Sequence, residues 1–484
     1  MTEKISSIAR NTSYFTLALV LQKIISLAYF TMYARVLGPA DLGQYYFAVS
    51  ITSIFSIFID FGLGNILTRE IAKDESRASS LANTILTAKL FFSLATLAIL
   101  FIWTGLWHYD PLTKQLIYIS SIAMVLDNFT GIFYAILRGY HNLKFESIAS
   151  VIFQLIVLGA SLIVININGD IRWLMASLGL ASLFNLGYSW LAARRLAGLH
   201  LRLSWDAATF KQVFLLALPF AIYAIFQRFY TYFDSVLLFK FAGDQAVGLY
   251  QVPFKIVVAI QFLPMAFTAS LYPALSAYWQ RNREQLAITF ERAISYSLIL
   301  SIPIMIGTIV LADQIITIFK ESFSAVAWPL QVTMLAVPFM FLGFPVGSLL
   351  NACDRQKRNT INIAITSIAS AALNFYLIPK WGVMGACVTN LITSIVMLGL
   401  GWLVIPQIFK LRLKRLAVMV IKVSAAGICM GIGVYLLKSI THPIVNIVFG
   451  ALLYLIALFV FRGFTKEDIQ SVLASFVRPN AKTV

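Results

Sequence analysis

Two charged side chains stand deep inside long apolar stretches of the sequence, and they are its best-placed ligand-binding residues. Lys23 is about eleven residues, or about 16 Å of helix, into the first stretch, and Arg228 is similarly central in a later one. In a membrane, a charge at that depth costs roughly 2.5 to 3.5 kcal/mol. Arg binds phosphate through a planar fork and Lys as a point charge, so the pair predicts a cavity for an anionic ligand. The alternative is that each side chain reaches the surface or pairs locally.

Three further side chains could complete such a site. Lys255 lies about eight residues from one end of its apolar stretch, so it could join Arg228 or extend to the surface. Tyr29 and Tyr230 share the stretches of Lys23 and Arg228, and they offer rings and hydroxyls suited to sugars. Packing or anchoring in a membrane explains either tyrosine equally well. We therefore expect Lys255, Tyr29 and Tyr230 to contact the ligand beside the two central cations.

Acidic side chains also occur inside apolar stretches. Asp60 and Asp127 could each neutralise Lys23 or Lys89, or carry a coupling proton or ion. The two interpretations are equally good for both carboxylates. Lys89 lies close to one end of its stretch, so we expect its side chain to extend to the surface.

No group of residues indicates covalent or metal chemistry. The cysteines Cys353, Cys387 and Cys429 are far apart, and the four histidines lack the HExxH spacing of a zinc site. A nucleophile beside a base and a phosphate-cradling glycine loop are both missing from the sequence. We therefore expect no catalytic residue, no metal and no cofactor, and an energy input from an ion gradient or the membrane potential.

The composition identifies the elements that must position these residues. The chain is 60% hydrophobic and only 12% charged, with a mean hydropathy of +0.84, which excludes a soluble globule. Apolar stretches near the length of a membrane helix predict about fourteen spans. The stretches cover residues 12–34, 44–67, 82–105, 115–137, 147–167, 172–193, 212–238, 247–272, 292–312, 328–351, 360–378, 384–406, 417–437 and 444–462.

The connections between these spans differ in charge. With the N-terminus inside, 25 Lys and Arg residues fall on the inner side and 7 on the outer side. This bias predicts a multi-pass membrane protein with both termini cytoplasmic. Inner connections beside anionic lipid also account for the net charge of +17, so we expect no nucleic-acid partner.

The sequence also contains a weak internal repeat. At a shift of 205 positions, Gln22 and Lys23 match Gln227 and Arg228. The same shift relates Gly38, Gly43 and Tyr45 to Gly243, Gly248 and Tyr250. Six spans separate the copies, so the two halves have the same orientation and are related by an axis along the membrane normal. We expect two six-helix lobes with the ligand path between them.

Several segments resemble polysaccharide-export flippases of the Wzx type. They are RVLGPADLGQY at residues 35–45, DFGLG at 60–64, LRG at 137–139, LYPALS at 271–276 and IPKWGVMGA at 378–386. That family shares a superfamily with multidrug and toxic-compound exporters and lipid II flippases. The resemblance implies alternating access by two lobes, with the helices that carry Lys23 and Arg228 lining a central cavity. It also implies that these two cations bind the pyrophosphate of an undecaprenyl-pyrophosphate-linked oligosaccharide.

The expected organisation follows from the repeat and the resemblance together. Residues 1–205 form an N-terminal lobe, 206–410 a C-terminal lobe, 411–463 two additional helices and 464–484 a cytoplasmic tail. The expected partners are the lipid-linked oligosaccharide, membrane lipids and other polysaccharide assembly proteins.

Two other functions remain open at this point. An ion-coupled multidrug exporter of the same fold would favour acidic residues in the path, as Asp60 and Asp127 allow. A membrane-embedded glycan polymerase or ligase usually carries a large outer loop with catalytic residues. The outer connections of this chain are too short for such a loop.

Overall fold

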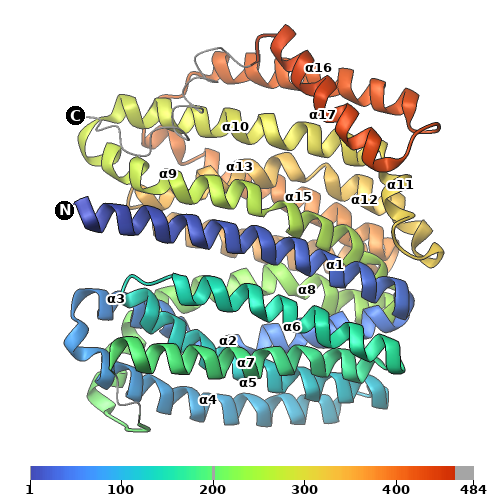
Figure 1. Ribbon diagram of the computed structural model, residues 1–484. Coiled ribbons are helices and arrows are strands. Elements are labelled where there is room, and N and C mark those ends of the chain that lie inside the picture. Colours follow the sequence, from blue (N-terminus) through green and yellow to red (C-terminus); the bar gives the residue numbers. More distant parts are fainter. Residues whose placement is uncertain (1, 199–201, 464–484) are drawn as a thin grey trace.

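The computed structural model describes residues 2–198 and 202–463, and within these ranges every regular element is a helix. Figure 1 shows the long helices lying roughly parallel in one bundle. The sequence-based prediction of an all-α protein is therefore confirmed. The predicted tail at residues 464–484 lies outside the described residues.

The helices follow one another with short connections. The first half contains α1 (Thr2–Phe55), α2 (Ile57–Asp60), α3 (Leu63–Lys73), α4 (Ala78–Leu106), α5 (Pro111–Gly139), α6 (Lys144–Ile167) and α7 (Ile171–Ala197). The second half contains α8 (Ala207–Ile260), α9 (Phe262–Arg281), α10 (Arg283–Val310), α11 (Ala312–Ile316), α12 (Ala327–Met334), α13 (Val337–Ala352), α14 (Gln356–Trp381) and α15 (Val383–Trp402). The chain continues with α16 (Leu413–Leu437) and α17 (Pro443–Val460), and short 3-10 helices cover Glu75–Arg77, Glu321–Val326 and Ile405–Gln407.

Eleven of the described helices are long and apolar enough to cross a membrane, or twelve if a bent pair at 321–352 is one span. Two of these segments, 16–60 and 207–281, are longer than a single span needs. Each contains a glycine kink, so each could cross twice. The predicted number of fourteen spans stays a prediction.

The kinks occur at repeat-related glycines. Gly38 has φ 77° and ψ 179° inside α1, and Gly243 has φ 82° and ψ 178° inside α8. Only glycine adopts this conformation readily, because a side chain at positive φ meets its own backbone. The two halves of the chain thus bend in the same way at positions 205 residues apart.

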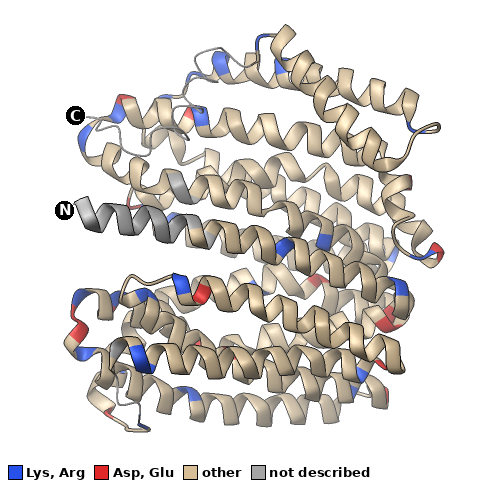
Figure 2. Ribbon diagram, in the orientation of Figure 1, with Lys and Arg blue, Asp and Glu red and all other residues tan. Residues whose placement is uncertain are grey.

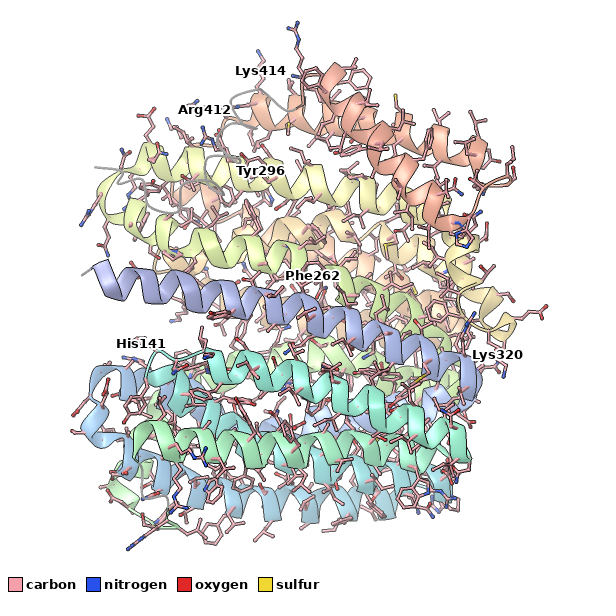
Figure 3. All side chains as sticks on the ribbon, in the orientation of Figure 1. His141, Phe262, Tyr296, Lys320, Arg412 and Lys414 are labelled. Carbon is pink, nitrogen blue, oxygen red and sulfur yellow. The ribbon has the colours of Figure 1, made fainter. Side chains whose placement is uncertain are left out.

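The hydrophobic core joins the two lobes around both kinks. One buried cluster combines residues around both kinks with residues of α5, α7, α12 and α13, and it includes Phe30, Leu42, Leu238, Phe319 and Phe323. At the other end, a cluster on α3, α4 and α5 also includes Val213 and Ala217 of α8, and a separate cluster lies on α9, α10, α13 and α16. We call the joined end, which contains Lys320, the closed end, and the end with His141 and Arg412 the open end (Figure 3).

Backbone contacts at the closed end are reciprocal. A methyl group on Gly43 would lie 1.8 Å from the backbone oxygen of Asp244, and one on Gly248 would lie 1.8 Å from that of Pro39. Beside them, Gln44 donates to the Asp244 carboxylate at 3.2 Å, and the Phe47 ring stacks on Phe239 at 3.7 Å. Glycine at both positions therefore allows α1 and α8 to touch backbone to backbone.

Replacing either contact glycine should separate the lobes at the closed end. We expect Gly43→Ala and Gly248→Ala each to lower stability by about 1–3 kcal/mol, because the added methyl group overlaps a carbonyl that cannot rotate away. Thermal unfolding of purified protein in detergent measures this loss. Gly105→Ala is the control, since a methyl group there meets nothing within 4 Å. Unchanged melting of both closed-end variants would contradict the contact.

Candidate functional site

A large cavity lies between the lobes toward the open end, with a volume of about 1270 Å³. Its wall comes from α3 of the first lobe, from α8, and from α9, α13 and α14 of the second lobe. Among the described residues, three cations line it, namely Arg69, Arg228 and Lys357, and no acidic residue does. Five carboxamide side chains share the wall: Asn65, Gln227, Asn351, Gln356 and Asn359. Such a wall suits a ligand that carries both negative charge and hydroxyl groups.

Arg228 occupies a central place in this arrangement. Its guanidinium lies over the Tyr232 ring at 5.9 Å, and the residue is exposed to the cavity. It also lines a smaller cavity of about 190 Å³ inside the first lobe, together with Asp127, Asn128 and three serines. Among the described residues, no carboxylate lies within ion-pair distance of Arg228. Its guanidinium fork is therefore available to a ligand.

Lys23 is not among the described residues that line the large cavity, and its charge affects that of Lys255. Its predicted role in ligand binding stays a prediction. The Lys255 ammonium lies over the Tyr46 ring at 4.4 Å, which partly compensates for its burial. Figure 2 shows that most cations gather near the helix ends and that few lie along their middles. Lys23 and Lys255 are close enough for their charges to affect each other, and neither is among the residues that line the large cavity.

The two tyrosines predicted to contact a ligand have different surroundings. Tyr29 accepts a hydrogen bond from the Ser26 hydroxyl at 3.2 Å, and its ring packs against Tyr33 at 5.5 Å. Tyr230 bonds to the Thr393 hydroxyl at 3.3 Å and lines a further cavity of about 590 Å³ in the second lobe. Only Tyr230 therefore borders one of the cavities described here.

The Asp60 carboxylate forms an ion pair with Lys89 at 2.6 Å. The Lys89 ammonium also donates to the backbone oxygen of Asn128, and its side chain is 1% exposed. The expectation that Lys89 extends to the surface is therefore wrong, because a carboxylate and a carbonyl inside the first lobe satisfy its charge. Asp60 is oriented by the Gly62 amide, which donates to it at 3.2 Å.

Sequence reasoning missed two of the three cavity cations. Arg69 and Lys357 lie in or next to the predicted inner connections, where positive charges are common. A partial signal exists, because Asn65 and Arg69 are four residues apart and so share one helix face. Nothing in the sequence indicates that α14 brings Lys357 to the same cavity.

The fold and this cavity define a membrane transporter built from two helical lobes. A solved structure, the lipid II flippase MurJ in an inward closed conformation, has the same fold, with a TM-score of 0.78 and 16% sequence identity. The likeness covers 92% of this chain and 98% of that one.

Residues 8–279, more than half of the chain, match the family described as polysaccharide biosynthesis protein. The chain therefore belongs to the polysaccharide biosynthesis protein family, as the sequence motifs predicted. Residues 219–377 also match the MatE family. The probable low-salt glycan biosynthesis flippase Agl15 of Haloferax volcanii is 20% identical over 88% of this chain and 90% of its own length. The capsular polysaccharide biosynthesis protein CapF of Staphylococcus aureus is 20% identical over 80% of this chain and 97% of its own length.

The Asp60–Lys89 pair predicts a stability effect that a second substitution should reverse. Asp60→Asn leaves the buried Lys89 ammonium without a carboxylate, so the protein should melt at a lower temperature. The loss of folding stability should be at most about 3 kcal/mol, because the Asp60 side chain is 41% exposed. This value is the lower end of the range for breaking a buried ion pair. Combining Asp60→Asn with Lys89→Met should restore most of it, since no unpaired charge then remains.

Glu70→Gln provides the matched control for this experiment. Glu70 pairs with Lys73 at 2.8 Å, but the Lys73 side chain is 53% exposed, so the change should be small. Equal melting temperatures for Asp60→Asn and the wild type would show that the pair does not stabilise the lobe.

Proposed function

We propose that this protein moves a lipid-linked, anionic oligosaccharide across the membrane by alternating access between its two lobes. The observation that carries the proposal is the cavity between the lobes, whose described wall residues include three cations and five carboxamides and no carboxylate. It is bounded at one end by the shared core around Gly43 and Gly248. The flippases among the relatives support the same class of substrate.

The chemistry of the wall fits the parts of such a substrate. Arg228 and Arg69 can bind phosphate oxygens through two parallel hydrogen bonds, and Lys357 adds a mobile positive charge. Carboxamides can donate to and accept from sugar hydroxyls. Leu218, Phe220 and Ile222 of α8 also line the cavity, and all three are exposed. They offer an apolar wall to the lipid chain, and undecaprenyl pyrophosphate is the carrier we propose.

Movement needs cation sites at more than one depth. We propose that Lys23 and Lys255, with Tyr29 nearby on α1, receive the pyrophosphate after it leaves Arg228. A like-charged pair is costly in a membrane, and an anion placed between the two ammonium groups would remove that cost. Tyr230 would contact the sugar, because it borders the second-lobe cavity.

Transport in one direction also needs coupling. Asp127 is our proposed coupling residue, since it lines the small first-lobe cavity beside Arg228 and can take up a proton or cation there. Asp60 would act by holding Lys89 in place. We place the protein in a bacterial-type inner membrane with the open end and both termini cytoplasmic. If Arg412→Cys were labelled from outside intact cells, the result would contradict that orientation.

A multidrug exporter of the same fold is the main alternative. Cationic drugs would be attracted by carboxylates in the large cavity, and its wall instead carries Arg69, Arg228 and Lys357. The charge of the wall therefore favours an anionic substrate.

Removal of a central cation should reduce transport without reducing the amount of protein. Lys23→Ala and Arg228→Ala should each weaken export, because an anion contact is lost while a membrane cost is relieved. Arg228→Lys should keep part of the activity, since the charge remains but the fork is lost. The measurement is surface polysaccharide in cells whose only copy carries the change, with membrane levels checked by immunoblot.

Two further variants sharpen the same assay. Lys211→Ala removes an exposed cation at the start of α8, so it should export normally. Asp127→Asn should make export insensitive to an uncoupler that reduces the wild type. Normal polysaccharide in cells with both Lys23→Ala and Arg228→Ala would reject the role of the central cations.

A further inference from the structure

The large cavity adjoins a second one whose wall carries no charge. This second cavity, of about 590 Å³, is lined by α8, α9, α13, α14 and α15 of the second lobe. Tyr223, Gln227, Tyr272, Asn351 and Asn359 line both cavities, so they form the boundary. Within the part of the chain that the structure describes, no Asp, Glu, Lys, Arg or His lines the second cavity. The space between the lobes thus has a cationic half and an uncharged half.

The uncharged half is nevertheless rich in hydrogen-bonding groups and rings. Asn359 is buried, and its amide donates to the Asn351 side chain at 3.3 Å, which fixes the orientation of both carboxamides. The Thr268 hydroxyl is buried and has no hydrogen-bond partner among the described residues. A buried hydroxyl without a partner is unfavourable, so a ligand that bonds to it would bind more tightly.

We propose that the uncharged half binds the neutral sugars next to the pyrophosphate of the substrate. This inference rests on the proposed function, because the cationic half must hold the phosphates. Neutral sugars can exchange their bonds to water for bonds to carboxamides and hydroxyls, and their apolar faces can lie on Tyr230 and Tyr272. A sugar acid would have to bury its carboxylate where no cation lines the wall, which is costly. The lipid-proximal sugars should therefore be uncharged.

Gly343 provides a way to fill the uncharged half alone. It lines this cavity from α13, and a methyl group added to it meets nothing within 4 Å. Gly343→Leu should therefore place its side chain in the cavity, and leucine also favours a helix more than glycine does. Gly399 of α15 is the matched control, because an added methyl group there also meets nothing within 4 Å and the residue lines neither cavity.

The test measures binding of three probes to purified full-length protein in detergent. The first probe is undecaprenyl pyrophosphate without sugar, and the second is the same lipid with a neutral disaccharide. The third carries a disaccharide in which the sugar attached to the pyrophosphate is a uronic acid. We expect the wild type to bind the neutral disaccharide lipid most tightly. Gly343→Leu should raise the Kd for that probe about ten-fold, the loss of about 1.4 kcal/mol, and leave the Kd of the sugar-free lipid unchanged. Gly399→Leu should behave as the wild type.

Two further variants keep the result decisive. Thr268→Val keeps the size of the side chain but removes the hydroxyl, so it should weaken only the sugar-bearing probes even if Gly343→Leu fails to fold. Arg228→Ala should weaken all three probes. Wild-type protein that binds no probe would reject the proposed function itself. Binding of the sugar-free lipid together with equal affinity for the neutral and acidic disaccharides would reject only the uncharged sugar site, as would variants at Gly343 and Thr268 that leave sugar binding unchanged.

Discussion

The close approach of two glycines to opposing backbone carbonyls organises this structure. Gly43 faces the Asp244 carbonyl and Gly248 faces that of Pro39, with no room for a side chain at either position. Because α1 and α8 touch there, the apolar residues around both kinks merge into one core at the closed end. Toward the open end the first half of α8 packs against α3 and α4, whereas α9, α10, α13 and α16 form a separate core. The cavity lies between these two groups of helices.

The buried charges of the first lobe and the cavity serve different purposes. Lys89 is satisfied by Asp60 and by a backbone carbonyl, so its burial is explained by packing alone. Arg228 has no ion-pair partner among the described residues, and Lys23 and Lys255 repel one another. A membrane protein gains nothing in stability from such unpaired cations. Their retention fits the proposed role in binding an anion that moves between them.

The division of the inter-lobe space matches the substrate that we propose. Such a molecule carries negative charge at the pyrophosphate, hydroxyl groups on the sugars and a long apolar chain. The cavity wall places cations in one half and uncharged polar groups with aromatic rings in the other. Exposed apolar residues of α8 lie beside the cationic half. The position of each chemical type in the wall would orient the substrate during its passage.

Local sequence determined the helices, the membrane setting and the kinks, because apolar length and glycine conformation depend on few neighbours. The match between Gly38 and Gly243 could be read from the repeat, and both adopt the same backbone conformation. The partners of the charged residues depended on packing between distant helices. Lys89 meets Asp60 across 29 positions, and the charge of Lys23 on α1 affects Lys255 on α8. Arg69 and Lys357 became cavity residues because α3 and α14, which are far apart in the sequence, both border the same cavity.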